Sequence, residues 1–211
     1  MKINEGVMKK FIVIIFISLV INTSAIAQKN KDAIHNKIDS QKEKYEKIAK
    51  SIWEWAEVGY LEEKSSALLK NTLVDAGFDM RSGVADIPTA FVAEYGSGKP
   101  IIGILAEFDA LPGISQSVST KRSPIEGASA GHACGHHLFG TASTAAAIAI
   151  KDYLKSSKQK GTIRLYGTPA EEGGSGKVYM VRAGLFDDVD LVLDWHASDR
   201  NAANPGTSMA N

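Results

Sequence analysis

Cysteine is nearly absent from this 211-residue chain, which contains one, Cys134. No intrachain disulfide is therefore possible. A lone thiol is either a small buried apolar residue or a group with a chemical task. Cys134 lies among glycine and histidine residues rather than in an apolar run, and this favours the chemical task.

An excess of charge of one sign is also absent. Basic and acidic residues number 24 each, the formal net charge is zero, and no run of five basic residues occurs. Nucleic-acid binding depends on a broad basic surface, so we expect no nucleic-acid partner. The hydrophobic fraction of 44% is that of a soluble globular protein, and the length allows one domain with a sizeable core.

No apolar run reaches the roughly 20 residues that span a bilayer. The shorter run Phe11 to Ile21 follows Lys9 and Lys10 and precedes the small residues Ala25 and Ala27. This order is typical of a secretory signal peptide, predicted here over residues 1–27, although an uncleaved anchor is the alternative. We expect an exported protein, periplasmic or secreted, with no stable membrane span after cleavage.

Residues 28–211 show the alternation of an α/β domain. We predict helices over 34–55, 62–76, 138–154 and 176–183, and strands over 79–84, 89–95, 101–106, 162–166 and 191–195. The glycine-containing turn 96–98 predicts a hairpin-like unit. From residue 138 onward the order helix, strand, helix, strand predicts parallel neighbours. Residues 111–131, rich in Gly, Ser and Pro, are expected to form a long and functional loop.

Polar residues able to bind metal gather where predicted strands end. They occupy Glu107 to Pro112, Gly131 to His137, Pro169 to Gly174, and His196. Four of the five histidines and the only cysteine fall in these segments. In open α/β sheets, functional groups meet at such strand ends.

The types of residue in these segments predict a divalent metal site. Cys134 and His136 are two apart, so an extended loop would project them to one side. Thiolate and imidazole suit zinc, with manganese or cobalt as alternatives. Neighbours on an extended chain point opposite ways, so one of Glu171 and Glu172 can bind metal while the other acts as base. His196 adds another nitrogen ligand.

Each of these residues also has a structural interpretation. His132 is expected to orient its loop, and His137 fits either role. Asp109 has the alternative of capping a turn. His196 has that of a hydrogen-bonded core histidine. Glu171 and Glu172 together have that of stabilising a helix N-terminus.

Three motifs carry a resemblance to a known family. His132-Ala-Cys-Gly-His136, Asp109-Ala-Leu-Pro112 and Pro169-Ala-Glu-Glu-Gly173 resemble metallopeptidase family M20, in the branch that cleaves N-acyl amino acids. The resemblance covers residue 31 to the end. It implies a three-layer α/β/α, zinc-exopeptidase-like catalytic domain with a mostly parallel, mixed sheet.

The resemblance also implies roles. Cys134 would bridge up to two ions, with His136, Glu172 and His196 as further ligands. Glu171 would be the general base, and Asp109 would orient a ligand. His132 and His137 are candidates for residues that support the ligands from beside them. The reaction implied is hydrolysis, by a metal-activated water, of the amide bond in N-acyl amino acids such as aminobenzoyl-glutamate.

The family has a lid domain, used for substrate contacts and homodimerisation, and a further histidine ligand beyond the strand that ends near His196. We expect this chain to contain only the N-terminal part of the catalytic domain. The alternative function is therefore a truncated, non-catalytic metal-binding fragment.

Two other motifs are weaker. The pattern Gly127 to Gly131 matches a serine-hydrolase elbow, but the preceding residues are polar where a hydrophobic strand is required. The run Gly173 to Lys177 suggests a phosphate loop, but Glu171 and Val178 break that pattern.

Overall fold

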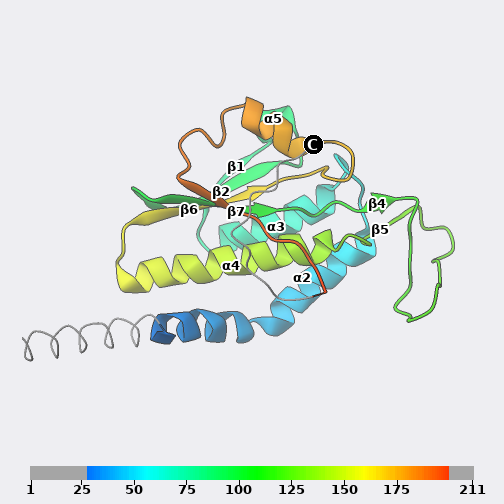
Figure 1. Ribbon diagram of the computed structural model, residues 1–211, viewed down its shortest axis with the longest axis horizontal. Helices are drawn as coiled ribbons and strands as arrows, with labels where there is room; N and C mark the ends of the chain where they lie inside the picture. The colour runs from blue at the N-terminus through cyan, green and yellow to red at the C-terminus, as the bar shows by residue number, and fades with distance from the viewer. Residues whose placement is uncertain (1–27, 200–211) are drawn as a thin grey trace, which may run out of the picture.

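The computed structural model describes residues 28–199 (Figure 1). The predicted signal peptide and the end of the chain, residues 200–211, lie outside the described residues. Residues 28–39 are helical, and a turn at residues 40–41 separates them from α2 (Lys42–Trp55), where the sequence predicted one continuous helix. Across residues 28–199, no helix is both long enough and apolar enough to cross a membrane.

Five strands form a mixed sheet in the order β1-β2-β6-β3-β7. The strands are β1 (Asp79–Ser82), β2 (Phe91–Ser97), β3 (Ile101–Ala106), β6 (Gly161–Gly167) and β7 (Leu191–Leu193). β3 pairs in parallel with β6 and with β7, whereas β2 is antiparallel to both β1 and β6. The predicted mixed α/β sheet is confirmed, and the carboxyl ends of β3, β6 and β7 lie at one edge.

The expected hairpin of β2 and β3 does not form, because β6 lies between them. Every residue of β6 is buried, and a strand buried in this way needs a hydrogen-bonded partner on each side. β2 and β3 supply those partners. The turn between them contains Gly96 and Gly98, both with positive φ, and carries the chain past β6 rather than back along β2. Residues 84–86 form a short 3-10 helix in place of the end of the first predicted strand.

Helices cover both faces of the sheet (Figure 1). α2, α3 (Glu63–Asp75) and α4 (His136–Ser157) lie on one face, and the short α5 (Gly176–Arg182) lies on the other. Successive strand residues point to opposite faces. Ile104 therefore packs under α2–α4, whereas Leu105 packs with Met180 of α5. The apolar run in β3 is explained by this burial on both faces.

Ion pairs hold the segment that leads into β7 against the sheet. The guanidinium of Arg164, in the buried β6, donates to the Asp188 carboxylate over 2.7 and 3.1 Å and to Glu94 of β2. Asp190 accepts from Lys99 at 2.7 Å and from the Ile101 amide at 2.7 Å. These contacts fix where β7 begins, and so where the chain beyond it reaches the sheet edge.

The predicted long loop is closed at its base by two short strands. β4 (Leu111–Pro112) pairs antiparallel with β5 (Ala130–Gly131). The chain between them projects from the body of the molecule beside the end of α2 (Figure 1). Ser129 is exposed and is followed by β5, not by a helix, so the structure lacks the strand–turn–helix elbow of a serine hydrolase at this motif.

Candidate metal centre

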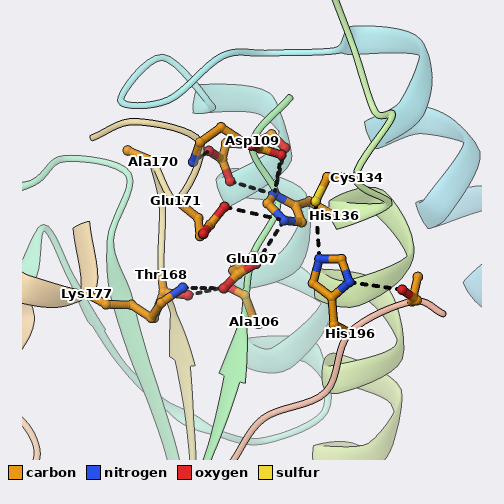
Figure 2. A network of polar contacts seen from close by, with 12 residues as sticks. Ala106, Glu107, Asp109, Cys134, His136, Thr168, Ala170, Glu171, Lys177 and His196 are labelled. Carbon is orange, nitrogen blue, oxygen red and sulfur yellow. Dashed lines mark hydrogen bonds and ion pairs between the residues drawn. The ribbon is translucent and has the colours of Figure 1, made fainter. Parts of the chain in front are cut away.

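Four segments meet where β3, β6 and β7 end (Figure 2). Glu107 and Asp109 follow β3, Glu171 and Glu172 follow β6, and His196 follows β7 by three residues. The fourth segment enters α4. Gly135 has φ 90°, and the helix begins at His136, two residues earlier than predicted. Because a left-handed residue separates them, Cys134 and His136 do not lie on an extended strand.

His136 is fully buried, and Asp109 holds one of its ring nitrogens. Nδ1 lies 2.9 Å from the Asp109 carboxylate Oδ1 and 3.1 Å from the Asp109 carbonyl. The other carboxylate oxygen of Asp109 accepts the Glu172 amide at 2.8 Å. Asp109 therefore ties the first turn of α4 to the loop after β6. A histidine whose Nδ1–H donates to a carboxylate presents Nε2 for other chemistry.

Two carboxylates lie on the Nε2 side of the His136 ring (Figure 2). The Glu107 Oε2 atom is 2.9 Å from Nε2, and the Glu171 Oε2 atom is 3.8 Å from it. Within the described part of the chain, Nε2 is buried and forms no hydrogen bond of acceptable geometry. Glu107, His136 and Glu171 each offer a ligand atom, and these atoms lie within 4.8 Å of one another.

Cys134 and His196 lie on the more open side of His136. The Cys134 sulfur is 3.2 Å from His196 Nε2, and one ligand atom from each of Cys134, His136 and His196 falls within a 4.8 Å group. Glu172 Oε1 lies 3.8 Å from His136 Nδ1 and is buried, with no hydrogen-bond partner in the described structure. The site thus gathers sulfur, nitrogen and oxygen donors from four chain segments.

Glu171 and Glu172 do not point in opposite directions as an extended chain would require. Residues 171–174 form a turn, which follows Ala170 at φ 57°. Both carboxylates consequently face the His136 ring, Glu171 at Nε2 and Glu172 at Nδ1. The Glu171 side chain is 42% exposed and the Glu172 side chain 13% exposed, so Glu171 is the more accessible of the two to a substrate.

The electrostatics of the cluster favour a cation. Burial lowers the pKa of His136, but the hydrogen bond to Asp109 and the negative charges of Glu107 and Asp109 outweigh it and raise the pKa to about 10. Burial, followed by the charges of Glu172 and Glu171, raises the pKa of the Cys134 thiol to about 11. The carboxylates around the imidazole contribute to both shifts, and a divalent ion would relieve their excess of negative charge.

The residues present fit a divalent ion. Thiol, imidazole and carboxylate are the groups that bind zinc, and carboxylate-rich sites also take manganese. Nε2 of His136 and Oε1 of Glu172 are buried polar atoms without hydrogen bonds in the described structure, as expected of atoms that bind a metal ion. The donor types and the unpaired buried atoms therefore both fit a divalent ion.

His132 and His137 lie beside the cluster but outside both groups of ligand atoms. His132 Nε2 donates to the Ile52 carbonyl at 3.1 Å and so anchors the loop before α4 to α2. The two rings are 5.1 Å apart. Burial, aided by the charge of His137, lowers the pKa of His132 to about 4.

Sequence reasoning assigned no specific role in this site to three of its residues, Glu107, Lys177 and Glu62. Glu107 flanks the His136 ring together with the predicted Asp109, and their spacing of two after a strand was the available signal. Lys177 Nζ forms an ion pair with Glu107 Oε1. The buried Glu62 accepts the amide of residue 170 at 2.8 Å and so holds the turn that carries residue 171. No sequence pattern predicted these contacts of Lys177 and Glu62, because they span 70 and 108 residues.

A mixed α/β sheet with thiol, imidazole and carboxylate donors at its carboxyl edge defines an α/β protein with a candidate divalent-metal centre. Residues 103–209 match the family described as Peptidase family M20/M25/M40. The chain belongs to this family. The matched region contains the four segments of the centre.

Curated relatives agree with this assignment. The chain is 47% identical over 167 residues to a subunit of the p-aminobenzoyl-glutamate hydrolase of Escherichia coli K12, covering 77% of this chain and 34% of that protein. It is 30% identical over 187 residues to human Xaa-Arg dipeptidase, covering 79% of this chain and 38% of the relative. The chain spans about a third of the length of these relatives.

Solved structures share the fold. A dinuclear metal-binding peptidase of the M20 family from Bacillus subtilis matches with a TM-score of 0.59 and 24% identity, over 79% of this chain and 44% of that one. An aminobenzoyl-glutamate utilization protein from Klebsiella pneumoniae matches with a TM-score of 0.58 and 17% identity, over 79% and 46%.

Proposed function

We propose that this chain contributes the metal-binding part of a metal-dependent amidohydrolase that cleaves small N-acyl amino acids of the aminobenzoyl-glutamate type. The observation that carries the proposal is the Cys134, His136, His196 group with two glutamates against the same imidazole. The relative of 47% identity and the M20 family support amide hydrolysis as the reaction.

The proposed ligands are Cys134, His136, Glu172 and His196, for up to two ions, with zinc as the first expectation. The Bacillus subtilis neighbour is described as dinuclear, which supports two ions. When bound, a divalent ion would polarise the scissile carbonyl and lower the pKa of a water. Cys134 is a ligand rather than a nucleophile in this proposal, because burial and the surrounding carboxylates raise the pKa of its thiol to about 11 without a cation.

Glu171 is proposed as the general base. Its carboxylate is the more exposed of the adjacent pair and lies 3.8 Å from His136 Nε2. It can therefore reach a water molecule beside the ion and is not itself required as a ligand. It would accept the proton of the attacking water and return it to the leaving amine. Asp109 holds His136 in place and touches no substrate in this scheme.

A chelator and one substitution test this function together. The purified chain is incubated with p-aminobenzoyl-glutamate, and released glutamate is measured with and without EDTA. Replacing Glu171 by Gln is expected to lower turnover by at least about 100-fold while metal content stays near that of the parent. Glu43→Gln, on the exposed surface of α2, is the matched control and keeps parental activity.

The second candidate is a metal-binding chain without turnover; the relatives that support amide hydrolysis are matched over only about a third of their length. A parent chain that binds metal and releases no glutamate supports this candidate. EDTA-sensitive release of glutamate excludes it, and activity unchanged in Glu171→Gln contradicts the assignment of the base.

Export is proposed from the signal-like segment at residues 1–27. Its test is separate from that of the metal centre: the amino-terminal sequence of the protein recovered from the periplasm or medium is expected to begin after Ala27. Accumulation in the cytoplasm with an intact amino terminus contradicts it.

A further inference from the structure

Glu107 and Lys177 form an arrangement that the proposed ligand set does not use. Glu107 follows β3 and its side chain is buried, and Lys177 extends from α5 on the opposite face of the sheet from α4. Figure 2 shows Glu107 between Lys177 and His136. One carboxylate oxygen, Oε1, pairs with the Lys177 ammonium, and the other, Oε2, faces His136 Nε2 at 2.9 Å.

We propose that Glu107 is a further metal ligand, which binds the ion on the Nε2 side of His136, and that Lys177 is the positioning residue that aims it. This inference rests on the proposed function. Without the other ligands, Glu107 would bind no ion, but the ligand role of Glu107 is not needed for the others to bind one.

The distances suit a shared ion. Two ligands bound to a tetrahedral zinc at about 2.0–2.1 Å lie about 3.3 Å apart. The separations from His136 Nε2 are 2.9 Å to Glu107 Oε2 and 3.8 Å to Glu171 Oε2, which bracket that value. The imidazole nitrogen is buried and aimed between the two carboxylates without a hydrogen bond of acceptable geometry in the described structure. A cation bound to Nε2 and to Glu107 Oε2 would satisfy both buried atoms, with the Glu171 carboxylate beside it, as its proposed role of base requires.

Lys177 fixes the direction of the Glu107 carboxylate. A buried carboxylate is costly unless its oxygens are paired, and the ammonium satisfies Oε1 and leaves Oε2 toward the ring. Loss of Lys177 has two opposite effects on cation binding. It removes a repelling positive charge, but it also frees the Glu107 side chain to rotate. The Lys177 side chain is 31% exposed, so water screens its charge, and the loss of orientation is expected to dominate.

An added carboxylate also shifts which metal the site prefers. Cysteine and histidine donors favour zinc, whereas carboxylate oxygens suit manganese. Glu107 supplies an oxygen donor on the Nε2 side of His136, and Cys134 and His196 supply softer donors in the other group. Glu107 therefore contributes more to the binding of Mn²⁺ than to that of Zn²⁺.

The test is direct binding of the two ions to the purified, metal-stripped chain, by calorimetry for both and by the electron paramagnetic resonance signal of free Mn²⁺. Glu107→Gln keeps the size of the side chain and is expected to lower the affinity for Mn²⁺ by about 100-fold and the affinity for Zn²⁺ by about tenfold. Lys177→Met is expected to lower the affinity for Mn²⁺ by about tenfold, and Lys177→Arg is expected to restore part of that affinity. Lys42→Met, on the exposed surface of α2, is the control and binds as the parent does. Circular dichroism confirms that each variant is folded.

The outcomes separate this inference from the function on which it rests. Folded Glu107→Gln with the Mn²⁺ and Zn²⁺ affinities of the parent overturns the ligand role of Glu107, and the proposed function then stands without it. A weakened Glu107→Gln beside an unchanged Lys177→Met overturns the role of Lys177. A folded parent chain that binds neither ion contradicts both the inference and the proposed function.

Discussion

The carboxylate of Asp109 joins two ligand-bearing segments through its two oxygens. Oδ1 lies 2.9 Å from Nδ1 of His136, and Oδ2 accepts the Glu172 amide at 2.8 Å. A single buried side chain therefore fixes the position of the first turn of α4 relative to the turn after β6. In the proposed centre this contact decides which nitrogen of His136 faces the ion.

Asp109→Asn tests that role. His136 and Glu172 donate to different oxygens of Asp109, and asparagine has an oxygen at only one of these two positions, so its NH₂ group would oppose the donor at the other. We expect metal affinity to fall by about 10- to 100-fold, as for other partners of metal-binding histidines. Titration calorimetry measures it, with Asp75→Asn at the exposed end of α3 as the control. Parental affinity in folded Asp109→Asn would show that Asp109 does not orient the ligand.

Gly140→Ala tests how closely α4 must approach the end of β3. Gly140 lies one turn after His136, and a Cβ there would be 2.7 Å from the Glu107 carbonyl and 3.1 Å from Leu69 Cδ1. Alanine normally stabilises a helix interior by about 1 kcal/mol relative to glycine. Here the clash with backbone is expected to reverse the sign and destabilise the protein by about 1–3 kcal/mol.

Urea unfolding measures this effect, beside Ser156→Ala at the exposed end of α4 as the control. The same displacement moves His136 relative to Glu107 and Asp109, so metal affinity should fall with stability. A Gly140→Ala variant more stable than the parent would mean that α4 can shift freely against β3.

The buried His132 predicts a pH dependence of folding stability in the metal-free chain. Its pKa is about 4 in the folded chain, below the ordinary value of 6.5, so the unfolded chain binds the additional proton between these values. Stability is therefore full above about pH 6.5 and falls as pH decreases toward 4, by at most about 3 kcal/mol from this residue.

His132→Gln removes the titrating group and keeps a donor for the Ile52 carbonyl. Urea unfolding in EDTA at pH 5 and pH 7 should show a smaller difference between the two pH values for this variant than for the parent. His35→Gln, in the exposed helix of residues 28–39, should retain the parental difference. Equal pH dependence in parent and His132→Gln would place the titration elsewhere.

The sequence predicted the segments of the site better than their local geometry. Strand ends are readable because an apolar run such as Ile101 to Leu105 stops at a polar residue, and parallel strands then bring those ends together. The conformation of each ligand was not readable. The left-handed Gly135 and Ala170 turn the chain, so His136 begins a helix and Glu171 and Glu172 face one ring. A spacing rule for extended chain could not anticipate these turns.

The order of the strands in the sheet also could not be predicted from the sequence. The hairpin expected of β2 and β3 rests on a local turn signal, whereas insertion of β6 depends on burial that only the assembled sheet supplies. The same limit applies to Glu107, Lys177 and Glu62, whose partners are distant in sequence. Local patterns thus located the centre, and tertiary contacts determined which side chains complete it.

The metal content of the purified chain tests the central claim most directly. We predict at least one divalent ion per chain in the parent and in His35→Ala, measured by mass spectrometry of the elements after gel filtration. We predict its loss in folded Cys134→Ser, because the thiolate is one of the proposed ligands. A folded parent chain free of metal after incubation with zinc, or a Cys134→Ser variant with the parental metal content, would contradict the account.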